Sequence, residues 1–327
     1  MEIYFAPMEG MTSPLLRRTH AEMFGGCDKY YTPFISTNES ISLNNRESED
    51  VDHDQNRGLN LIPQIISNSA HQSALYIKLL AEKYGYGEVN INLGCPSGTV
   101  VSKGKGSGML RDPEALDDYL GRLLEELKDF SGKGINVPRI SIKARIGYLN
   151  PKEHIRITEI LKAHPVYQVT VHPRTRKQMY GGQVDMDAFT HMYEELKGIG
   201  VSVVYNGDIT KPDDIEMLTD RFPALDAVMI GRGLLADPSL ARRIKGGRAA
   251  DASEYSAYME RMLDGYMDKI GVEQFVLAKM KDLLNFSKPV FSGNDKGFRD
   301  MCKAGSVETY RVCMKQYIKN SKMYADE

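Results

Sequence analysis

The sequence predicts an α/β protein, a (β/α)8 TIM barrel followed by a small all-helical domain. Short apolar runs rich in β-branched residues alternate with helical patterns over the first 244 residues, and only helical patterns come after them. The runs number eight, which is the strand count of a closed barrel in a chain of this length. The predicted strands are Ile3–Ala6, Lys29–Thr32, Leu61–Ile65, Glu88–Asn92, Arg139–Lys143, Gln168–Val171, Ser202–Tyr205 and Ala227–Ile230.

Helical segments between the strands make the sheet parallel. Ala70–Tyr84 carries apolar side chains near helical spacing. Asp112 can cap a further helix, and Pro113 suits its first turn. Strands that alternate with helices run parallel. An open doubly wound sheet is the alternative. The first strand lacks the Gly-x-Gly-x-x-Gly turn of a dinucleotide-binding fold, and this favours the barrel.

The pattern changes after Ile244. We therefore expect a barrel domain over residues 1–244 and a helical domain over residues 245–327, with Lys245-Gly246-Gly247-Arg248 resembling a linker. The tail shows apolar periodicity typical of helices and no alternating strand pattern. Its predicted helices include Tyr255–Met267, Glu273–Leu284 and Val307–Ile318.

The tail also carries a local positive charge. Between Lys279 and Lys322, ten Lys and Arg residues stand against four Asp and Glu, an excess of six positive charges. Lys315 and Lys319 lie one helical turn apart and share a face. From this feature alone, a solvated helix face and a phosphate-contacting surface both remain open.

Composition narrows the class of protein. The net charge of −2 does not fit a uniformly basic nucleic-acid binder. The four cysteines form no Cys-x-x-Cys pair, which argues against a zinc site, and so few in a long chain argue against a disulfide-stapled secreted protein. The first residues show no signal-peptide pattern, and no apolar run is long enough to span a bilayer. We expect a cytoplasmic protein with no metal and no membrane contact.

Polar and glycine-rich groups follow nearly every predicted strand. Barrel enzymes work at the carboxyl ends of their strands, so these groups should meet at one rim. They occur at Pro7-Met8-Glu9-Gly10, Gln64, Asn92-Leu93-Gly94-Cys95, Lys143-Ala144-Arg145, His172-Pro173-Arg174, Asn206-Gly207-Asp208 and Gly231-Arg232-Gly233.

The last two turns favour a phosphorylated ligand. Asn206-Gly207-Asp208 and Gly231-Arg232-Gly233 follow strands seven and eight, where barrels often bind phosphate through backbone N–H groups. Glycine allows close backbone approach, and Arg232 can add a bidentate contact.

Other rim residues suit a heteroaromatic ring. Lys143 at a strand end can be only a charge in water, whereas opposite a flavin it would stabilise negative charge on the N1/O2 edge of the reduced ring. Gln64 and Asn92 supply amide donors and acceptors for a ring edge. His172 can contact ring or substrate, or be purely structural.

Cys95 is the candidate acid. A thiol has a reference pKa near ~8.5, so it is mostly protonated at neutral pH and can donate a proton. Residues 101–108 that follow contain three glycines and two lysines. We expect an irregular, mobile segment there, either a lid that carries two lysines or a plain flexible loop.

Several segments together resemble those of the tRNA-dihydrouridine synthases. In order and spacing they cover the whole barrel, Ile3 to Ile244, and the Cys-Pro-Ser and His-x-Arg-Thr-Arg segments are the most specific. They are Ala6-Pro7-Met8-Glu9-Gly10, Asn92-Leu93-Gly94-Cys95-Pro96-Ser97, Ile142-Lys143-Ala144-Arg145-Ile146-Gly147, Val171-His172-Pro173-Arg174-Thr175-Arg176-Lys177-Gln178-Met179-Tyr180, Asn206-Gly207-Asp208-Ile209 and Ile230-Gly231-Arg232-Gly233.

The resemblance implies a reaction and a site. FMN would be the cofactor, NADPH the reductant and tRNA the partner, with no obligate protein partner. The C5–C6 double bond of a uridine would be reduced by hydride from flavin N5 to C6 and a proton from Cys95 to C5. The implied cofactor residues are Pro7, Met8, Glu9, Gln64, Lys143 and His172 around the ring, and Asn206, Gly207, Asp208, Gly231 and Arg232 at the ribityl phosphate.

The resemblance also implies RNA contacts. Arg145, Arg174 and Arg176 are candidates for contacts to cofactor or RNA, and the helical tail with Lys315 and Lys319 fits a tRNA-binding domain in its position. Two residues depart from the family pattern: Pro173 stands where glycine is common and Lys177 where glutamate is common. Neither change removes a catalytic group.

Two other functions compete with this one. Another FMN barrel, similar to dihydroorotate dehydrogenase, would act on a small pyrimidine and would need no positive tail. A non-catalytic tRNA-binding protein on an inactive barrel would have no need for Cys95, Lys143 and His172.

Overall fold

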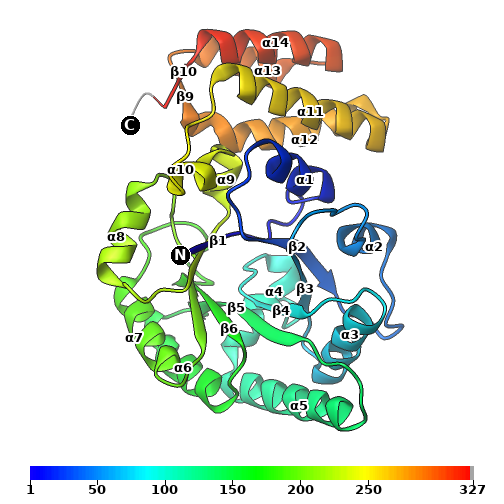
Figure 1. The fold of residues 1–327 in the computed structure, drawn as a ribbon, viewed down its shortest axis with the longest axis vertical. Coiled ribbons are helices and arrows are strands. Elements are labelled where there is room, and N and C mark those ends of the chain that lie inside the picture. The colour runs from blue at the N-terminus through cyan, green and yellow to red at the C-terminus, as the bar shows by residue number, and fades with distance from the viewer. Residues whose placement is uncertain (325–327) are drawn as a thin grey trace.

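The computed structural model describes residues 1–324, and within them eight parallel strands close into a barrel in sequence order (Figure 1). All eight predicted strands are confirmed. Each is bonded to its neighbours in the chain, and β1 pairs with β8 to close the ring. The strands are β1 (Glu2–Phe5), β2 (Lys29–Ser36), β3 (Leu61–Ile66), β4 (Glu88–Leu93), β5 (Arg139–Gly147), β6 (Gln168–Thr175), β7 (Ser202–Tyr205) and β8 (Ala227–Ile230).

Helices cover the outside of the barrel. In α5, the Asp112 side chain accepts a hydrogen bond from the N–H of Ala115, and Pro113 stands in the first turn, as predicted. The helices of this part are α1 (Pro14–Met23), α2 (Asn45–Val51), α3 (Ala70–Glu82), α4 (Gly98–Val101), α5 (Pro113–Gly132), α6 (His154–Ala163), α7 (Met186–Lys197), α8 (Asp213–Arg221), α9 (Arg232–Ala236) and α10 (Leu240–Ile244), with 3-10 turns η1 (Gly106–Arg111) and η2 (Pro151–Glu153).

Strands β5 and β6 run further than their apolar runs indicate. The two strands stay paired up to Gly147 and Thr175, with a shift in register after Arg145. Lys143, predicted as the last residue of its strand, therefore lies inside β5, and His172 lies within β6 instead of following it. A strand side chain is held more rigidly than one on a loop, so both groups have fixed positions at the mouth of the barrel.

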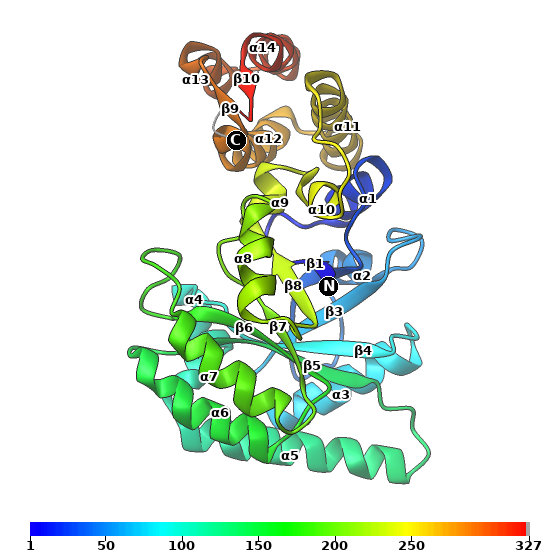
Figure 2. The ribbon, with the colours of Figure 1, turned by 60° about the vertical axis from the view of Figure 1, so that its left-hand side comes forward.

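The tail is a group of packed helices at one end of the barrel (Figures 1 and 2). The three predicted tail helices are confirmed, and α13 was missed because it is polar and buries only Met301. A two-residue strand pair, β9 with β10, is also present. The elements are α11 (Ala252–Ile270), α12 (Glu273–Ser287), η3 (Lys288–Val290), β9 (Phe291–Ser292), α13 (Asp295–Lys303), α14 (Val307–Asn320) and β10 (Lys322–Met323).

The tail packs tightly against the barrel. A Cβ added at Gly265 of α11 would lie 2.5 Å from a methyl group of Leu15 in α1, so glycine permits this close helix approach. On α12, the Lys279 ammonium donates a 2.8 Å hydrogen bond to the carbonyl of Gly10, after β1. One apolar cluster continues from Leu16 in the barrel into Met262 in the tail. The division at residue 244 stays a prediction. No helix among the described residues is long and apolar enough to cross a membrane.

Candidate active site

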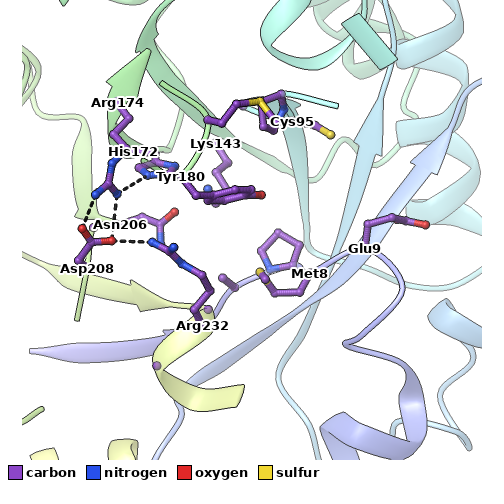
Figure 3. Close-up of a pocket in the computed structure, with 18 of the residues that line it drawn as sticks. Met8, Glu9, Cys95, Lys143, His172, Arg174, Tyr180, Asn206, Asp208 and Arg232 are labelled. Carbon is purple, nitrogen blue, oxygen red and sulfur yellow. Dashed lines mark hydrogen bonds and ion pairs between the residues drawn. The ribbon is translucent and has the colours of Figure 1, made fainter. Parts of the chain in front are cut away.

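A cleft of about 1450 Å³ opens at the carboxyl ends of the barrel strands (Figure 3). Most of the side chains predicted for the rim meet there, although they come from all parts of the barrel sequence. The predicted residues that line the cleft are Pro7, Met8, Glu9, Gln64, Asn92, Cys95, Lys143, Arg145, His172, Arg174, Asn206, Gly207, Asp208, Gly231 and Arg232. Arg176, Lys315 and Lys319 are not among its lining residues.

The backbone of the Cys95 loop is held in place by hydrogen bonds with the side chains of Asn92 and Ser107. The side-chain oxygen of Asn92 accepts hydrogen bonds from the N–H groups of Gly94, at 3.0 Å, and Cys95, at 2.8 Å. The Ser107 hydroxyl donates a 2.8 Å bond to the carbonyl of Cys95. Burial raises the pKa of the Cys95 thiol above its ordinary value. The thiol is therefore protonated at neutral pH and can act as an acid.

The segment after Cys95 is packed, and the expected irregular structure is wrong for half of it, because residue 101 and residues 106–108 lie in helical turns while residues 102–105 connect them. Residues 98–101 form α4, residues 106–111 form η1, and Ser107 is buried. A Cβ at Gly108 would lie 2.9 Å from the carbonyl oxygen of Val101. The glycines therefore serve close packing, which the sequence alone does not distinguish from flexibility. Lys105 at the turn donates to Ser36 Oγ at 3.2 Å and to the carbonyl of Thr37 at 3.1 Å.

The ammonium group of Lys143 has no hydrogen-bond or ion-pair partner among the described residues. Lys143 lies level with Asn92 on the neighbouring strand. Burial, and then the positive charge of Arg145, lower the pKa of Lys143 to about 7. A bound anion would reverse this shift and restore the charge on the lysine.

His172 is neutral in this environment. Burial is the main cause that lowers its pKa well below the ordinary value, and the surrounding cations, beginning with Lys143, add to it. Its Nε2 lies 3.4 Å from Nη1 of Arg174. A neutral imidazole can still donate or accept one hydrogen bond to a ligand.

Asp208 joins two arginines at the other end of the cleft (Figure 3). Its Oδ1 accepts from Nη1 of Arg174 at 2.9 Å and from Nη2 of Arg232 at 2.6 Å. Burial acts to raise the pKa of Asp208, but the hydrogen bonds and charges of the two arginines outweigh it and the pKa is lowered. One carboxylate between two guanidinium groups leaves a net positive charge at this end, which suits a phosphate.

Two glycine positions shape the same end. A Cβ at Gly207 would lie 2.0 Å from the hydroxyl oxygen of Tyr205, and one at Gly231 would lie 3.0 Å from the sulfur of Met8. Between them, the Asn206 amide donates a 2.6 Å hydrogen bond to the carbonyl of Met229 and ties β7 to β8. Backbone is thus exposed to the cleft where larger side chains cannot fit.

Some residues predicted to contact cofactor or RNA instead form ion pairs or hydrogen bonds with other groups of the protein. The Glu9 carboxylate pairs with Arg46 at 2.5 Å. Arg145 donates from Nε to the carbonyl of Gly94 at 2.9 Å and from Nη1 to Thr175 at 2.9 Å, so it braces the Cys95 loop. The Arg174 guanidinium also donates to the carbonyl of Gly182.

The remaining predicted cations lie away from the cleft. The guanidinium carbon of Arg176 lies 5.6 Å from the centre of the Tyr148 ring. On α14, Lys315 lies 3.5 Å from Glu260, and Lys319 is exposed. Arg311 on the same helix pairs with Glu260 and with Asp264, at 2.6 Å to the latter. The basic face of α14 is thus partly neutralised by α11.

Tyr180 is a lining residue that carried no predicted role. Its ring centre lies 5.1 Å from the guanidinium carbon of Arg232, 5.4 Å from that of Arg145 and 6.4 Å from the His172 ring. The preceding Met179 has a φ of +55°, a strained value for a side-chain-bearing residue. Tyr180 ends the segment from Val171 that resembles the family, and this was the signal available in the sequence.

The tail also contributes to the cleft. Asn285, Phe286, Pro289 and Val290, from α12 and η3, line it opposite the barrel residues. They were missed because their role depends on how the tail packs against the barrel. The cleft therefore lies between the barrel mouth and the tail. Within residues 1–324, no group of three or more His, Cys, Asp or Glu side chains is arranged to hold a metal ion.

A closed parallel barrel with a protonated cysteine and a cluster of cations at its carboxyl mouth is typical of a barrel enzyme and suits an anionic ligand. The family model described as dihydrouridine synthase matches residues 4–318, and the chain belongs to that family.

Relatives of this chain include proteins named as tRNA-modifying synthases. It is 30% identical over 243 residues to tRNA-dihydrouridine synthase B of Pasteurella multocida, covering 73% of this chain and 68% of the relative. It is 32% identical to a probable tRNA-dihydrouridine synthase of Rhizobium leguminosarum, covering 64% and 63% of the two chains. It is 25% identical to tRNA-dihydrouridine(16) synthase of Aquipseudomonas alcaligenes, covering 80% of each.

Among solved structures, morphinone reductase has a similar fold. The TM-score is 0.51 at 10% sequence identity, covering 77% of this chain and 87% of that chain. At this identity the likeness shows a shared barrel fold alone.

Proposed function

We propose that this protein reduces the C5–C6 double bond of a uridine in tRNA to dihydrouridine, with FMN as cofactor and NADPH as reductant. One observation carries the proposal: a half-buried, protonated Cys95 and an unpartnered Lys143 line the same cleft in a chain of the dihydrouridine synthase family. The thiol suits proton donation to carbon, and the lysine suits a ring edge that gains negative charge on reduction.

The cleft residues fit FMN. The ammonium of Lys143 lacks an anionic partner, as an N1/O2 ring edge would require. Some distance away, Arg232 and the backbone at Gly207 and Gly231 offer a site for a phosphate. Met8 lines the same cleft and supplies an apolar surface for a ring (Figure 3). When bound, reduced FMN supplies the hydride for C6 of the uracil ring.

The protein's own groups then hold the substrate and move the proton. Cys95 donates its proton to C5, so that hydride and proton together saturate the double bond. The Asn92 oxygen accepts from two backbone N–H groups, and one of its two amide N–H groups donates to Gln64, which leaves the second amide N–H as a donor toward a ligand. Neutral His172 adds one further hydrogen bond without a competing charge.

The shape of the cleft favours RNA over a free base. Its walls come from the barrel mouth on one side and from α12 and η3 on the other, a wider site than one pyrimidine needs. A uridine must leave its stack to reach Cys95, which is easiest in a loop of the RNA. Lys103 and Lys105 at the rim, with Lys315 and Lys319 further out, would contact phosphates. Such a reaction on tRNA would take place in the cytoplasm.

Reoxidation of the reduced flavin separates this function from its rivals. The protein is loaded with FMN, reduced with NADPH without oxygen, and mixed with unmodified tRNA, free uridine or orotate. Rapid reoxidation by tRNA alone supports the proposal, whereas reoxidation by orotate alone indicates a small-pyrimidine enzyme. If no pyrimidine reoxidises the flavin while tRNA still binds, the non-catalytic function is favoured.

A further inference from the structure

A chain of buried hydrogen bonds crosses the barrel interior beneath Cys95. Glu88, Asn90 and Asn92 alternate along β4, so all three side chains point into the barrel at successive levels. Ser141 from β5 and Gln64 from β3 stand level with Asn90 on the two neighbouring strands. All five side chains are buried, and they link the cleft to the opposite end of the barrel.

Each bond in the chain is short and well defined. Ser141 Oγ donates to Glu88 Oε1 at 2.9 Å, and Asn90 Nδ2 donates to Ser141 Oγ at 2.9 Å. Gln64 Nε2 donates to Asn90 Oδ1 at 2.7 Å, and Asn92 Nδ2 donates to Gln64 Oε1 at 2.8 Å. Asn92 Oδ1 finally accepts from the N–H groups of Gly94 and Cys95. At the far end, Lys29 donates to Glu88 Oε2 at 2.8 Å.

The two ends fix the direction of every bond between them. An ionised carboxylate only accepts, and a backbone N–H only donates. With Glu88 at one end and the Cys95 N–H at the other, the hydroxyl and the three amides can all be satisfied in one orientation. Turning any one amide over would place donor against donor, or acceptor against acceptor, in a buried site.

The chain suits orientation and not proton transfer. Carboxamides neither gain nor lose protons near neutral pH, so three amides in series would interrupt a proton path. A fully satisfied buried network instead imposes one geometry on its members. Here the last member is Asn92, which holds the Cys95 loop and faces the cleft.

We propose that Glu88, Ser141, Asn90 and Gln64 are positioning residues that act through Asn92 to fix the orientation of the Cys95 loop. The proposal deepens the proposed function, on which its catalytic consequence rests. Its structural consequence, the placement of the Cys95 thiol, can be measured without any reaction.

The variant Ser141→Ala tests the chain with the smallest change, the loss of one oxygen. Ser202→Ala is the matched control, because Ser202 stands at the same level of the barrel and accepts a 3.1 Å bond from Gln168 outside the chain. The readout is the rate at which iodoacetamide alkylates Cys95 in the FMN-loaded and FMN-free proteins, followed by mass spectrometry of the peptide that contains it. The second readout is kcat and KM for dihydrouridine formation, with melting temperature and FMN content recorded for each variant.

We expect Ser141→Ala to speed Cys95 alkylation about three- to tenfold, the range that follows from the net worth of one hydrogen bond. It should lower kcat by a similar factor and leave KM for tRNA and FMN content unchanged. Ser202→Ala should match the wild type in both. Ser141→Thr, which restores the hydroxyl, should return alkylation toward the wild-type rate.

Three results would overturn the proposal. One is wild-type alkylation in a folded Ser141→Ala protein, and another is an equal increase in Ser202→Ala. The third is a lowered kcat that tracks melting temperature in all variants without any change in alkylation. If the wild type makes no dihydrouridine, the proposed function fails, and the alkylation comparison still decides the positioning role.

Discussion

The N–H of Cys95 donates a 2.8 Å hydrogen bond to the side-chain oxygen of Asn92, the residue that ends the interior chain of β4. This bond sets the thiol at the mouth of the barrel, in the same cleft as Lys143. The Cys95 thiol and the Lys143 ammonium have different tasks in the proposed reaction, and each task gives a separate prediction.

Replacing Cys95 should remove the proton donor and little else. We expect Cys95→Ala to lower kcat about 100-fold or more, the usual contribution of a positioned general acid. FMN content and tRNA affinity should stay at wild-type levels, since the side chain is small and the loop is held by its backbone. The check is single-turnover dihydrouridine formation beside a filter-binding assay. Cys313→Ala, in the tail helix α14, is the control and should react normally.

Binding of FMN should depend on pH through Lys143. The pKa of Lys143 is lowered to about 7 by burial and by Arg145, so the lysine is partly neutral at pH 7 without a ligand. A hydrogen bond from the ammonium to the electron-rich N1/O2 edge of the ring stabilises the charged form of the lysine and raises that pKa, and binding then takes up a proton. FMN affinity should therefore be highest below pH 7 and should fall as the pH rises through and above it.

Fluorescence titration of FMN between pH 6 and 9 measures this dependence. The range extends from about one unit below the pKa of Lys143 to about two units above it. Burial lowers the pKa of His172 and raises that of Cys95, which keeps both groups from titrating strongly in this window. Lys143→Met should bind more weakly at pH 6 and show a flatter profile. A slope in Lys143→Met equal to that of the wild type would assign the proton to another group.

Gly207→Ala should damage the phosphate end of the cleft. The new methyl group would lie 2.0 Å from the Tyr205 hydroxyl, so the ring or the turn must move, at a cost of about 2 kcal/mol in unfolding free energy. FMN retention should drop in the same variant because the turn faces the cleft. Gly87→Ala is the control, since nothing lies within 4 Å of its added methyl group. Equal melting temperatures and FMN content for the two variants would contradict this role.

Neutralising the exposed tail lysine should weaken RNA binding without touching the flavin. We expect Lys319→Ala to raise KM for tRNA and to reduce the slope of log affinity against log salt by about one charge contact. Lys315→Ala should have a smaller effect, because Glu260 already lies 3.5 Å from its ammonium. NADPH oxidation should stay unchanged in both.

The control for these lysines is Lys128→Ala on the exposed face of α5, at the end of the molecule opposite the tail (Figure 2). A KM for tRNA that is unchanged in Lys319→Ala at physiological salt, or raised equally in Lys128→Ala, would remove α14 from the RNA surface.

Much of the barrel was predictable because its signals are local. Each buried strand is a short β-branched run, and parallel strands bring their carboxyl ends to one rim, so Cys95, Lys143 and Asp208 were predicted together. Partners were not predictable in this way. The Glu9 carboxylate pairs with Arg46, and Arg145 braces the Cys95 loop. Both contacts join segments that are distant in the sequence, so local patterns do not predict them.

The tail and the segment after Cys95 show the same limit. Phe286 faces the cleft only because α12 packs over the barrel mouth, a relationship between two surfaces that no local pattern encodes. Gly106 and Gly108 indicated a flexible segment in the sequence, yet they are buried in η1. A glycine is chosen for freedom in one setting and for lack of volume in another, and the neighbours decide which.

Nucleoside mass spectrometry of tRNA tests the central claim most directly. Unmodified tRNA is incubated with the protein, FMN and NADPH, digested, and searched for dihydrouridine, and a partial digest of the same sample locates the modified position. We expect dihydrouridine in the wild-type sample and almost none with Cys95→Ala. A reducible flavoprotein that leaves every uridine of the tRNA intact, or equal yields from the two proteins, would contradict it.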